Sequence, residues 1–392
     1  MLRALVTAKK LQPFGTSVFG EMTRLANEHG AINLSQGFPD FEGPPDIIEA
    51  AIEAMRSGQN QYARSMGHPK LVTAIAEKTQ RVYGLSYDPL KEVNVFSGAT
   101  EGIFSSLVGL LDPGDEVIFF EPFYDSYPVA TAVAGATPRF YTLRFPKFEL
   151  DLDELAKLFN DKTKLIVINT PHNPSGKVFT RAELEGIAAL CLKHDVSVMT
   201  DEVYEHLTYD DAVHVPMAAL PGMRDRTLTL SSAGKTFSYT GWKIGWETGP
   251  EHLIKATQAA HQFVTFATST PFQVAMATAM DRHRDAFYAE LKREYTARRD
   301  FLVDALREVG FEVALPRGAY FILASYAKHH AGDDVAFAPW LVEKHKIAAI
   351  PPSSFYASDV AEGRRLVRFA FCKKEETLRT ARERLRGLTT RP

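Results

Sequence analysis

Lys235 stands in the stretch SSAGKTFSYTGWKIGW, residues 231–246, where two kinds of chemistry are open. The letters GKT could end a phosphate-binding P-loop, but that motif needs a glycine five positions before Gly234, and Thr229 stands there. A lysine just after a strand can instead form a Schiff base with a carbonyl compound, including pyridoxal phosphate. The spacing therefore excludes a P-loop and leaves a covalent role for Lys235 beside that of an ordinary surface lysine.

Three polar residues follow other apolar, β-rich runs of the chain. Asp201 ends the run VSVMT, and a carboxylate buried there needs a cationic partner such as a protonated pyridine nitrogen, unless Asp201 caps a helix. Tyr204 comes three residues later, a spacing that on a helical turn would place both side chains on the same side, and Asn173 lies in NTPHNPSGKVF after the run LIVINT. Both side chains can contact a ring oxygen, although packing is the ordinary role of a tyrosine and a turn that of an Asn-Pro pair.

The junction Gly98-Ala99-Thr100 predicts a phosphate site. The run VNVFS ends there and a helix is expected to begin, so free backbone amides and the helix dipole favour an anion. Glycine is also common in such turns without a ligand. Ser232 and Lys243, on either side of the GKT lysine, can supply a hydroxyl and a cation to the same phosphate.

Two further side chains suit a ligand. Tyr124 in EPFYDSY follows the run EVIFF and can stack on an aromatic ring, with core packing as the alternative. Arg368 lies between apolar residues in LVRFAF, where an arginine needs a partner, and its planar guanidinium suits a carboxylate. A substrate carboxylate and an internal salt bridge both fit Arg368.

Short apolar runs alternate with longer helical patterns in the middle of the chain, which is typical of a mainly parallel sheet covered on both faces. Such open α/β sheets bind ligands at the carboxyl ends of their strands. The polar residues described above follow these ends, so the sequence predicts an α/β fold with the site there. The expected strands are residues 93–97, 116–120, 165–170, 196–200 and 227–232.

The pattern changes from about residue 285, where a charged helical stretch precedes the apolar runs AYFILA, IAAIP and LVRFAF. Charged helices beside short strands are typical of an α+β layer, and no Pro-, Gly- or Ser-rich linker separates the parts. We expect residues 1–45 to be an N-terminal segment contributing to a small domain. Residues 46–284 are expected to form a large coenzyme-binding domain, and residues 285–392 the C-terminal small domain.

The composition is that of an ordinary globular protein, with 392 residues, 45% of them hydrophobic and 24% charged. A net charge of -3 indicates no surface for nucleic acid or an anionic membrane. The two cysteines, Cys191 and Cys372, lie in apolar stretches and are expected to be free and buried. Without a signal sequence, a membrane span or metal-ligand spacing, we expect a cytoplasmic protein that binds no metal.

Several of these motifs, in this order, resemble the class I and II aminotransferases, which are fold-type I pyridoxal-phosphate enzymes. NPSG, DEVY, SAGKT and a C-terminal RF carry the likeness. NLSQGFPDF, NQYARSMGHP, EPFYDSY and TDEVYEHL are most similar to the subgroup of kynurenine aminotransferase, glutamine transaminase and bacterial methionine aminotransferase, and Lys243 agrees with that subgroup. The likeness spans nearly the whole chain. It implies a large domain with a mainly parallel seven-stranded sheet and a smaller α+β domain.

The resemblance also implies a role for each matching residue. Lys235 would form the aldimine with pyridoxal phosphate and act as general base, and Asp201 would pair with the pyridine nitrogen. The other implied contacts are Tyr204 and Asn173 with the ring oxygen, Tyr124 on the ring, Gly98, Ala99, Thr100, Ser232 and Lys243 around the phosphate, and Gly37, Asn173 and Arg368 with the substrate. Arg368 would hold its α-carboxylate.

A homodimer is implied too, in which Tyr62 reaches the phosphate of the neighbouring subunit. We expect methionine, glutamine, phenylalanine or kynurenine to fit an apolar or aromatic pocket formed by Phe19, Tyr124, Phe266 and Phe355. Thr100 stands where some animal members carry an aromatic residue, so their substrate preference does not transfer directly. The expected reaction is ping-pong transamination with a 2-oxo acid. Cysteine-S-conjugate β-lyase activity is the nearer alternative, and a non-catalytic coenzyme-binding regulator is the other.

Overall fold

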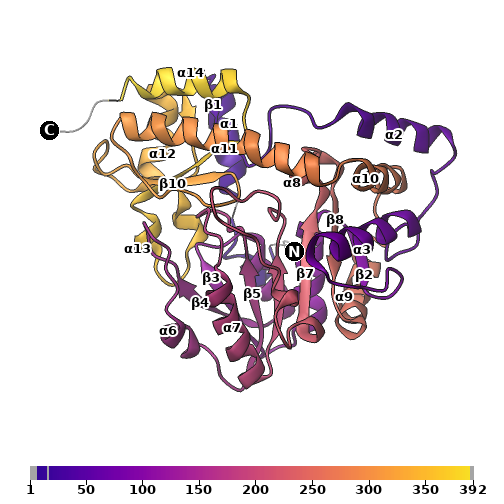
Figure 1. Ribbon diagram of the computed structural model, residues 1–392. Helices are drawn as coiled ribbons and strands as arrows, with labels where there is room; N and C mark the ends of the chain where they lie inside the picture. The colour runs from indigo at the N-terminus through magenta and orange to yellow at the C-terminus, as the bar shows by residue number, and fades with distance from the viewer. Residues whose placement is uncertain (1–6, 16, 389–392) are drawn as a thin grey trace, which may run out of the picture.

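A seven-stranded sheet forms the centre of the computed structural model, which describes residues 7–15 and 17–388 (Figure 1). Its strands are β2 (Val93–Ser97), β3 (Glu116–Glu121), β4 (Thr137–Thr142), β5 (Thr163–Asn169), β6 (Ser197–Asp201), β7 (Thr227–Ser232) and β8 (Ile244–Thr248). Their order across the sheet is β2-β8-β7-β6-β5-β3-β4. β8 runs antiparallel to β2 and β7, and the other neighbouring pairs are parallel.

The prediction of a mainly parallel sheet is confirmed, because each of the five apolar runs forms a strand close to its expected bounds. The sequence does not predict β4 or β8. β4, TPRFYT, is the half-exposed edge strand and contains a proline, so it lacks a continuous apolar run. β8, IGWET, is fully buried but carries a glycine and a glutamate, which hide its strand character.

Helices cover both faces of this sheet. Ile166 and Ile168 of β5 share one hydrophobic cluster with Leu184 of α7, whereas Leu165 and Val167 share another with residues of α4 and α9. Alternate residues of a strand point to opposite faces, so the continuous apolar run of β5 serves both layers. The helices of this part are α2 (Pro45–Arg56), α3 (Pro69–Tyr83), α4 (Ala99–Leu110), α5 (Ser126–Ala134), α6 (Leu152–Ala156), α7 (Arg181–His194), α8 (Ala233–Thr236), α9 (Glu251–Val264) and α10 (Thr270–Arg282).

Residues 18–33 lie beside the C-terminal part of the chain, above the large sheet in Figure 1. β1 (Ile32–Asn33) pairs in parallel with β11 (Ile347–Ala348), and β12 (Leu366–Ala370), β10 (Phe321–Ser325) and β9 (Glu312–Val313) form an antiparallel sheet. The helices of this part are α1 (Val18–Glu28), α11 (Asp285–Glu308), α12 (Asp334–His345), α13 (Val360–Gly363) and α14 (Glu375–Leu385). The short 3₁₀ helices of the chain are η1 (Lys9–Leu11), η2 (Met217–Ala219), η3 (Arg224–Arg226), η4 (Thr240–Trp242) and η5 (Pro352–Phe355).

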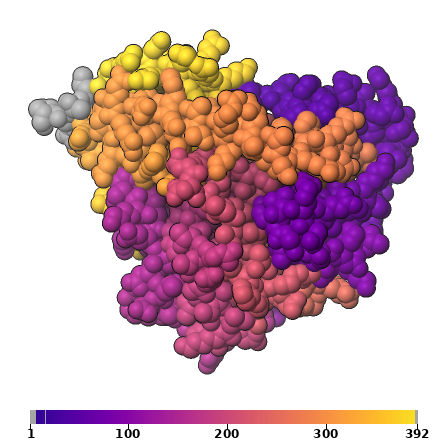
Figure 2. All heavy atoms as spheres, viewed as in Figure 1, coloured from indigo at the N-terminus to yellow at the C-terminus, as the bar shows by residue number. Residues whose placement is uncertain are grey.

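A buried hydrophobic cluster joins the small sheet to its helices. It includes Ile322 and Phe369 of the sheet, Leu302 of α11 and Leu378 of α14, and it reaches Tyr204 beyond the end of β6. Figure 2 shows the orange and yellow C-terminal residues in direct contact with the magenta middle of the chain. The small sheet is therefore packed against the carboxyl-end side of the large one.

Within the described ranges, no helix combines the length and the apolar character needed to cross a membrane. Cys191 and Cys372 are both free and buried, as expected. The first six residues, which belong to the predicted N-terminal segment, lie outside the described residues.

Candidate active site

A cavity of about 390 Å³ lies at the carboxyl ends of the large sheet and is bounded on its other side by β12 and the N-terminal segment. This is where an open α/β sheet is expected to bind a ligand. The predicted site residues that line the cavity are Phe19, Gly37, Gly98, Ala99, Thr100, Tyr124, Asn173, Asp201, Tyr204, Ser232, Lys235, Lys243 and Arg368. Residues up to 349 positions apart in the sequence are thus brought together.

Lys235 lies in α8, the single helical turn that directly follows β7. Its Nζ donates a hydrogen bond to the Gly37 carbonyl at 3.2 Å and lies 5.8 Å from the ring centre of Tyr204 and 5.5 Å from that of Tyr320. Burial lowers the pKa of the Lys235 amine to about 8. The amine therefore has a far larger neutral fraction near neutral pH than an ordinary lysine, which suits a nucleophile and a general base.

Asp201 is the last residue of β6 and is buried. Its Oδ2 accepts a hydrogen bond from the Tyr127 hydroxyl at 2.7 Å, and its Oδ1 accepts one from the Val203 amide at 3.4 Å. Burial raises the pKa of this carboxyl, while the Tyr127 bond acts in the opposite direction. A cationic ring nitrogen would stabilise the ionised form in this position.

The start of α4 has features that suit the binding of a phosphate. Gly98 caps the helix with φ of 78°, in the left-handed region that glycine adopts without strain. A Cβ added to Gly98 would lie 3.0 Å from the Lys243 ammonium nitrogen, so that cation lies directly against the helix N-terminus. Ser232 caps α8 by accepting a bond from the Gly234 amide at 3.2 Å. Two helix starts, a hydroxyl and an ammonium thus face one end of the cavity.

Arg368 lies in the middle of β12 with 1% of its surface exposed. Its Nη1 donates to Asn173 Oδ1 at 3.1 Å and its Nη2 to the Ser35 carbonyl at 2.8 Å, whereas Nε has no hydrogen-bond partner in the described chain. Burial lowers the pKa of the guanidinium to about 10. The described residues place no carboxylate in ion-pair contact with Arg368, so a bound carboxylate, and not an internal salt bridge, would complete this site.

Tyr204, Tyr124 and Asn173 line the cavity between these groups. Tyr204 lies in a turn after β6 and lines the same cavity as Asp201, and its ring meets that of Tyr320 edge-on with 4.9 Å between centres. The Tyr124 hydroxyl lies 3.4 Å from Thr100 Oγ1. Because the side-chain Oδ1 of Asn173 accepts a hydrogen bond from Arg368, the side-chain NH₂ group of Asn173 remains as a donor at the cavity wall.

Three predicted aromatic residues are not on the cavity wall. Phe355 is buried behind Phe19, with 5.8 Å between the stacked ring centres, so the structure corrects its expected direct contact with substrate to an indirect one. Tyr62 and Phe266 meet edge-on at 5.5 Å on the surface, where 82% and 47% of these residues are exposed. Within one subunit, neither reaches the cavity.

Sequence reasoning missed several residues that complete the site. Tyr127 holds Asp201, and the Tyr320 hydroxyl donates to the Gly37 carbonyl at 2.6 Å. Asn169, at the end of β5, accepts a bond from the Asn173 amide at 2.6 Å. The position of Asn169 at a strand end was an available signal. Tyr127 and Tyr320 carry no comparable signal, because the sequence does not distinguish a tyrosine that only packs in the core from one whose hydroxyl holds a site residue.

Comparison with known proteins identifies the family. The family model described as "Aminotransferase class I and II" matches residues 29–385. The chain belongs to the class I and II aminotransferases.

This aminotransferase is similar to several curated relatives. It is 44% identical to a probable N-succinyldiaminopimelate aminotransferase of Mycobacterium tuberculosis, over 99% of this chain and 100% of the relative. It is 41% identical to the methionine aminotransferase of Escherichia coli (98% and 99% covered) and to kynurenine–oxoglutarate transaminase 3 of Mus musculus (97% and 90% covered). The solved structure of the Mycobacterium tuberculosis enzyme superposes with a TM-score of 0.94, covering 97% of this chain and 99% of that one.

Class I and II aminotransferases are pyridoxal-phosphate-dependent enzymes of fold type I, and so is this one. The side chains that line the cavity also fit that coenzyme. Gly98 leaves room beside the Lys243 ammonium for a phosphate, Asp201 is a buried carboxylate suited to a ring nitrogen, and Lys235 is an amine of lowered pKa between them. The enzyme therefore acts on amino acids and 2-oxo acids.

Proposed function

We propose that the enzyme transfers the amino group of an amino acid with an uncharged side chain to a 2-oxo acid by a ping-pong mechanism. Methionine, glutamine, aromatic amino acids and kynurenine are the donor class. The observation that carries this proposal is the small number of cationic side chains in the described cavity wall. The cationic lining residues are Lys235, Lys243 and Arg368, and each has a different proposed role below. The described wall therefore has no further positive side chain that could bind a second carboxylate.

Arg368 is proposed to bind the substrate α-carboxylate. Its Nε is buried and has no hydrogen-bond partner among the residues that the structure describes, and the Ser35 carbonyl and Asn173 fix the orientation of the guanidinium plane. The rings of Phe321 and Phe19, 4.3 and 5.1 Å from the guanidinium carbon, exclude water from this contact. A carboxylate bound in a dry site with a fixed arginine is held in one orientation.

Lys235 is proposed to move the proton. When bound, pyridoxal phosphate supplies the electron sink that accepts the electron pair of the substrate Cα–H bond. The neutral Nζ of Lys235 takes the proton from Cα, and the hydrogen bond to the Gly37 carbonyl holds this amine in the cavity near the Tyr204 ring. Asp201, held by Tyr127, is proposed to pair as a carboxylate with the coenzyme ring nitrogen, whose positive charge would offset the effect of burial on this carboxyl. Tyr204 and Asn173 are proposed to donate to the ring oxygen, and Tyr124 to stack on the ring.

Gly98, Ala99, Thr100, Ser232 and Lys243 are proposed to hold the phosphate. Backbone amides at a helix start and an ammonium group supply the positive potential that such an anion needs. The Gly37 backbone is proposed to approach the substrate, because Gly37 lines the cavity and a Cβ there would lie 2.7 Å from the Phe321 ring, which leaves no room for a side chain.

A homodimer is proposed, with Tyr62 of each subunit reaching the phosphate of the other. Support comes from the exposed apolar side chains near the end of α9, where Phe263 is 87% and Val264 48% exposed next to the Tyr62–Phe266 pair. An exposed patch of this kind marks an interface. In this arrangement Phe266, which packs against Tyr62, lies in the interface and contributes to the active site of the neighbouring subunit.

We also propose the division into residues 1–45, 46–284 and 285–392. The pairing of β1 with β11 supports assigning the N-terminal segment to the small domain. The start of α11 at Asp285 supports the second boundary.

The proposal is tested by mixing the holoenzyme with a panel of amino donors and following the coenzyme absorbance. Methionine, glutamine and phenylalanine are expected to convert the coenzyme to its amino form, and a 2-oxo acid to reverse the change. Glutamate and N-succinyldiaminopimelate serve as donors with a second carboxylate. Faster conversion by either of these would contradict the proposed donor class.

A second assay separates transamination from β-elimination. A cysteine S-conjugate is supplied with and without a 2-oxo acid, and pyruvate and ammonia are measured. We expect turnover to depend on the 2-oxo acid. Release of pyruvate without an acceptor, with transamination absent, would replace the proposed reaction by a β-lyase.

A further inference from the structure

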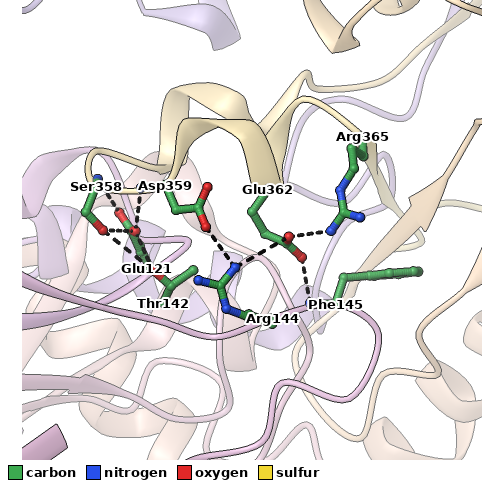
Figure 3. A network of polar contacts seen from close by, with 8 residues as sticks. All are labelled: Glu121, Thr142, Arg144, Phe145, Ser358, Asp359, Glu362 and Arg365. Atoms are coloured by element: carbon green, nitrogen blue, oxygen red, sulfur yellow. Dashed lines mark hydrogen bonds and ion pairs between the residues drawn. The ribbon is translucent and has the colours of Figure 1, made fainter. Parts of the chain in front are cut away.

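Glu121, the last residue of β3, joins the large sheet to the C-terminal part of the chain (Figure 3). Its side chain is completely buried, and both carboxylate oxygens are occupied. The donors are the amides of Ala357 (2.7 Å), Ser358 (3.0 Å) and Asp359 (3.0 Å) and the hydroxyls of Thr142 (2.7 Å) and Ser358. An ionised carboxylate is the side chain that only accepts, so it alone satisfies this set of donors.

The segment that Glu121 binds carries Phe355. The Phe123 amide, two residues after Glu121, donates to the Phe355 carbonyl at 2.8 Å. The Phe355 ring stacks on Phe19, which lines the cavity, and lies 5.4 Å from the guanidinium carbon of Arg368. A continuous set of contacts therefore runs from Glu121 through residues 355–359 to the proposed carboxylate site.

Neighbouring ion pairs reach the same region of the chain but are more exposed. Arg144 binds Asp359 at 2.7 Å and lies 3.9 Å from Glu362, but 62% of the Arg144 side chain is exposed. Exposed ion pairs contribute little, because solvent screens them and the side chains lose freedom. The buried carboxylate of Glu121 is the dominant polar contact to this segment.

We propose that Glu121 is a positioning residue for substrate binding, which acts by fixing residues 355–359 so that Phe355 keeps Phe19 and Arg368 in their binding arrangement. The proposal rests on the proposed role of Arg368. It assigns a substrate-binding effect to a side chain that touches neither substrate nor coenzyme.

The test compares Glu121→Gln with Arg144→Gln in the holoenzyme. Glutamine has the size of glutamate, but either orientation of its amide points an N–H₂ group at backbone donors that cannot turn away. The readout is the dissociation constant of 3-phenylpropionate, a carboxylate without an amino group, measured by calorimetry beside KM and kcat for phenylalanine.

For Glu121→Gln we expect the dissociation constant and KM to rise roughly tenfold, as for a lost buried hydrogen bond to a charged group, with kcat and the coenzyme absorbance unchanged. Arg144→Gln should leave all four quantities within about twofold. Unchanged binding in Glu121→Gln, or a joint loss of binding, kcat and coenzyme absorbance, would overturn the proposal. If the unaltered enzyme transaminates no donor but Glu121→Gln still weakens the binding of phenylpropionate, only the proposed function is overturned.

Two further variants keep the test decisive if Glu121→Gln does not fold. Thr142→Val and Ser358→Ala each remove one hydroxyl donor, and each should weaken phenylpropionate binding by a smaller factor; no change in either would contradict the proposal. In addition, Phe355→Leu should make the effect of Ser358→Ala largely disappear, because both act through the same ring. Fully additive effects would show that the segment does not act through Phe355.

Discussion

The two walls of the cavity hold their charged groups in different ways. The strand-end wall, formed by Gly98, Asp201, Ser232, Lys235 and Lys243, comes from the ends of neighbouring elements of one sheet. The arginine wall, formed by Phe19, Gly37, Phe321 and Arg368, comes from the two ends of the chain.

The groups of the two walls also differ in their partners. Asp201 in the strand-end wall accepts hydrogen bonds from two donors, whereas Nε of Arg368 in the arginine wall is a buried donor that has no acceptor among the described residues. A wall built on one sheet can be preorganised for a resident coenzyme, while the other wall keeps a donor for a ligand that comes and goes. Coenzyme chemistry and substrate binding should therefore respond to different substitutions.

The largest effect is expected for Lys235→Ala in the strand-end wall. Removing the proposed general base should lower the rate of the amino-donor half-reaction by roughly 10⁴-fold, the upper range for acid–base catalysis. Stopped-flow absorbance of the coenzyme measures this rate. Retained transamination would remove Lys235 from the mechanism.

The second largest effect is expected for Asp201→Asn, also in the strand-end wall. Asparagine keeps the size and can accept the Tyr127 bond, but it carries no negative charge, so kcat is expected to fall roughly 100- to 1,000-fold as for other lost electrostatic contacts. KM for the donor should stay nearly constant, because Arg368 is untouched. Tyr127→Phe is the matched control and should lower kcat less, since it leaves the charge in place.

Arg368→Gln is predicted to act on binding instead. Loss of a buried charged partner should lower kcat/KM for methionine by roughly 100-fold or more, mainly through KM, with the coenzyme absorbance unchanged. Arg368→Lys keeps the charge but not the planar group and should recover only part of the loss. A fall in kcat as large as that expected for Asp201→Asn would erase the distinction between the walls.

The pH dependence of Lys235 gives the smallest effect. A lysine whose pKa is lowered to about 8 becomes neutral as the pH rises through 8, so the apoprotein should react with pyridoxal phosphate about tenfold faster at pH 9 than at pH 7. The rate should level off above pH 9. A rate that keeps rising toward pH 10.5 would show that burial does not lower the pKa of this amine.

The strand-end wall was open to prediction from the sequence because its signals are local. Each of Asp201, Ser232 and Gly98 stands within a few residues of an apolar run, and parallel strands carry such residues to one edge. The family resemblance then supplied their expected roles. β4 and β8 were missed because the edge position of one and the polar residues of the other break the apolar pattern.

The arginine wall shows what local patterns do not contain. Arg368 was noticed because a charge interrupts an apolar run, but its contacts with Ser35 and Asn173 join distant segments. Phe355 was expected on the cavity wall and lies behind Phe19, because the order of two packed rings depends on the path of residues 352–359. The role of Glu121 could not be predicted from the local sequence, since four of its five donors lie in a segment more than 230 residues away.

The division between the walls is tested most directly by removing the carboxylate from the substrate. The half-reaction rates of phenylalanine and 2-phenylethylamine, which differ in that group, are measured with the unaltered enzyme and with Arg368→Gln. We predict that the unaltered enzyme prefers phenylalanine by roughly 100-fold or more and that Arg368→Gln loses most of this preference. An unchanged preference, with both rates lowered by the same factor, would contradict the assignment of Arg368 to the substrate carboxylate.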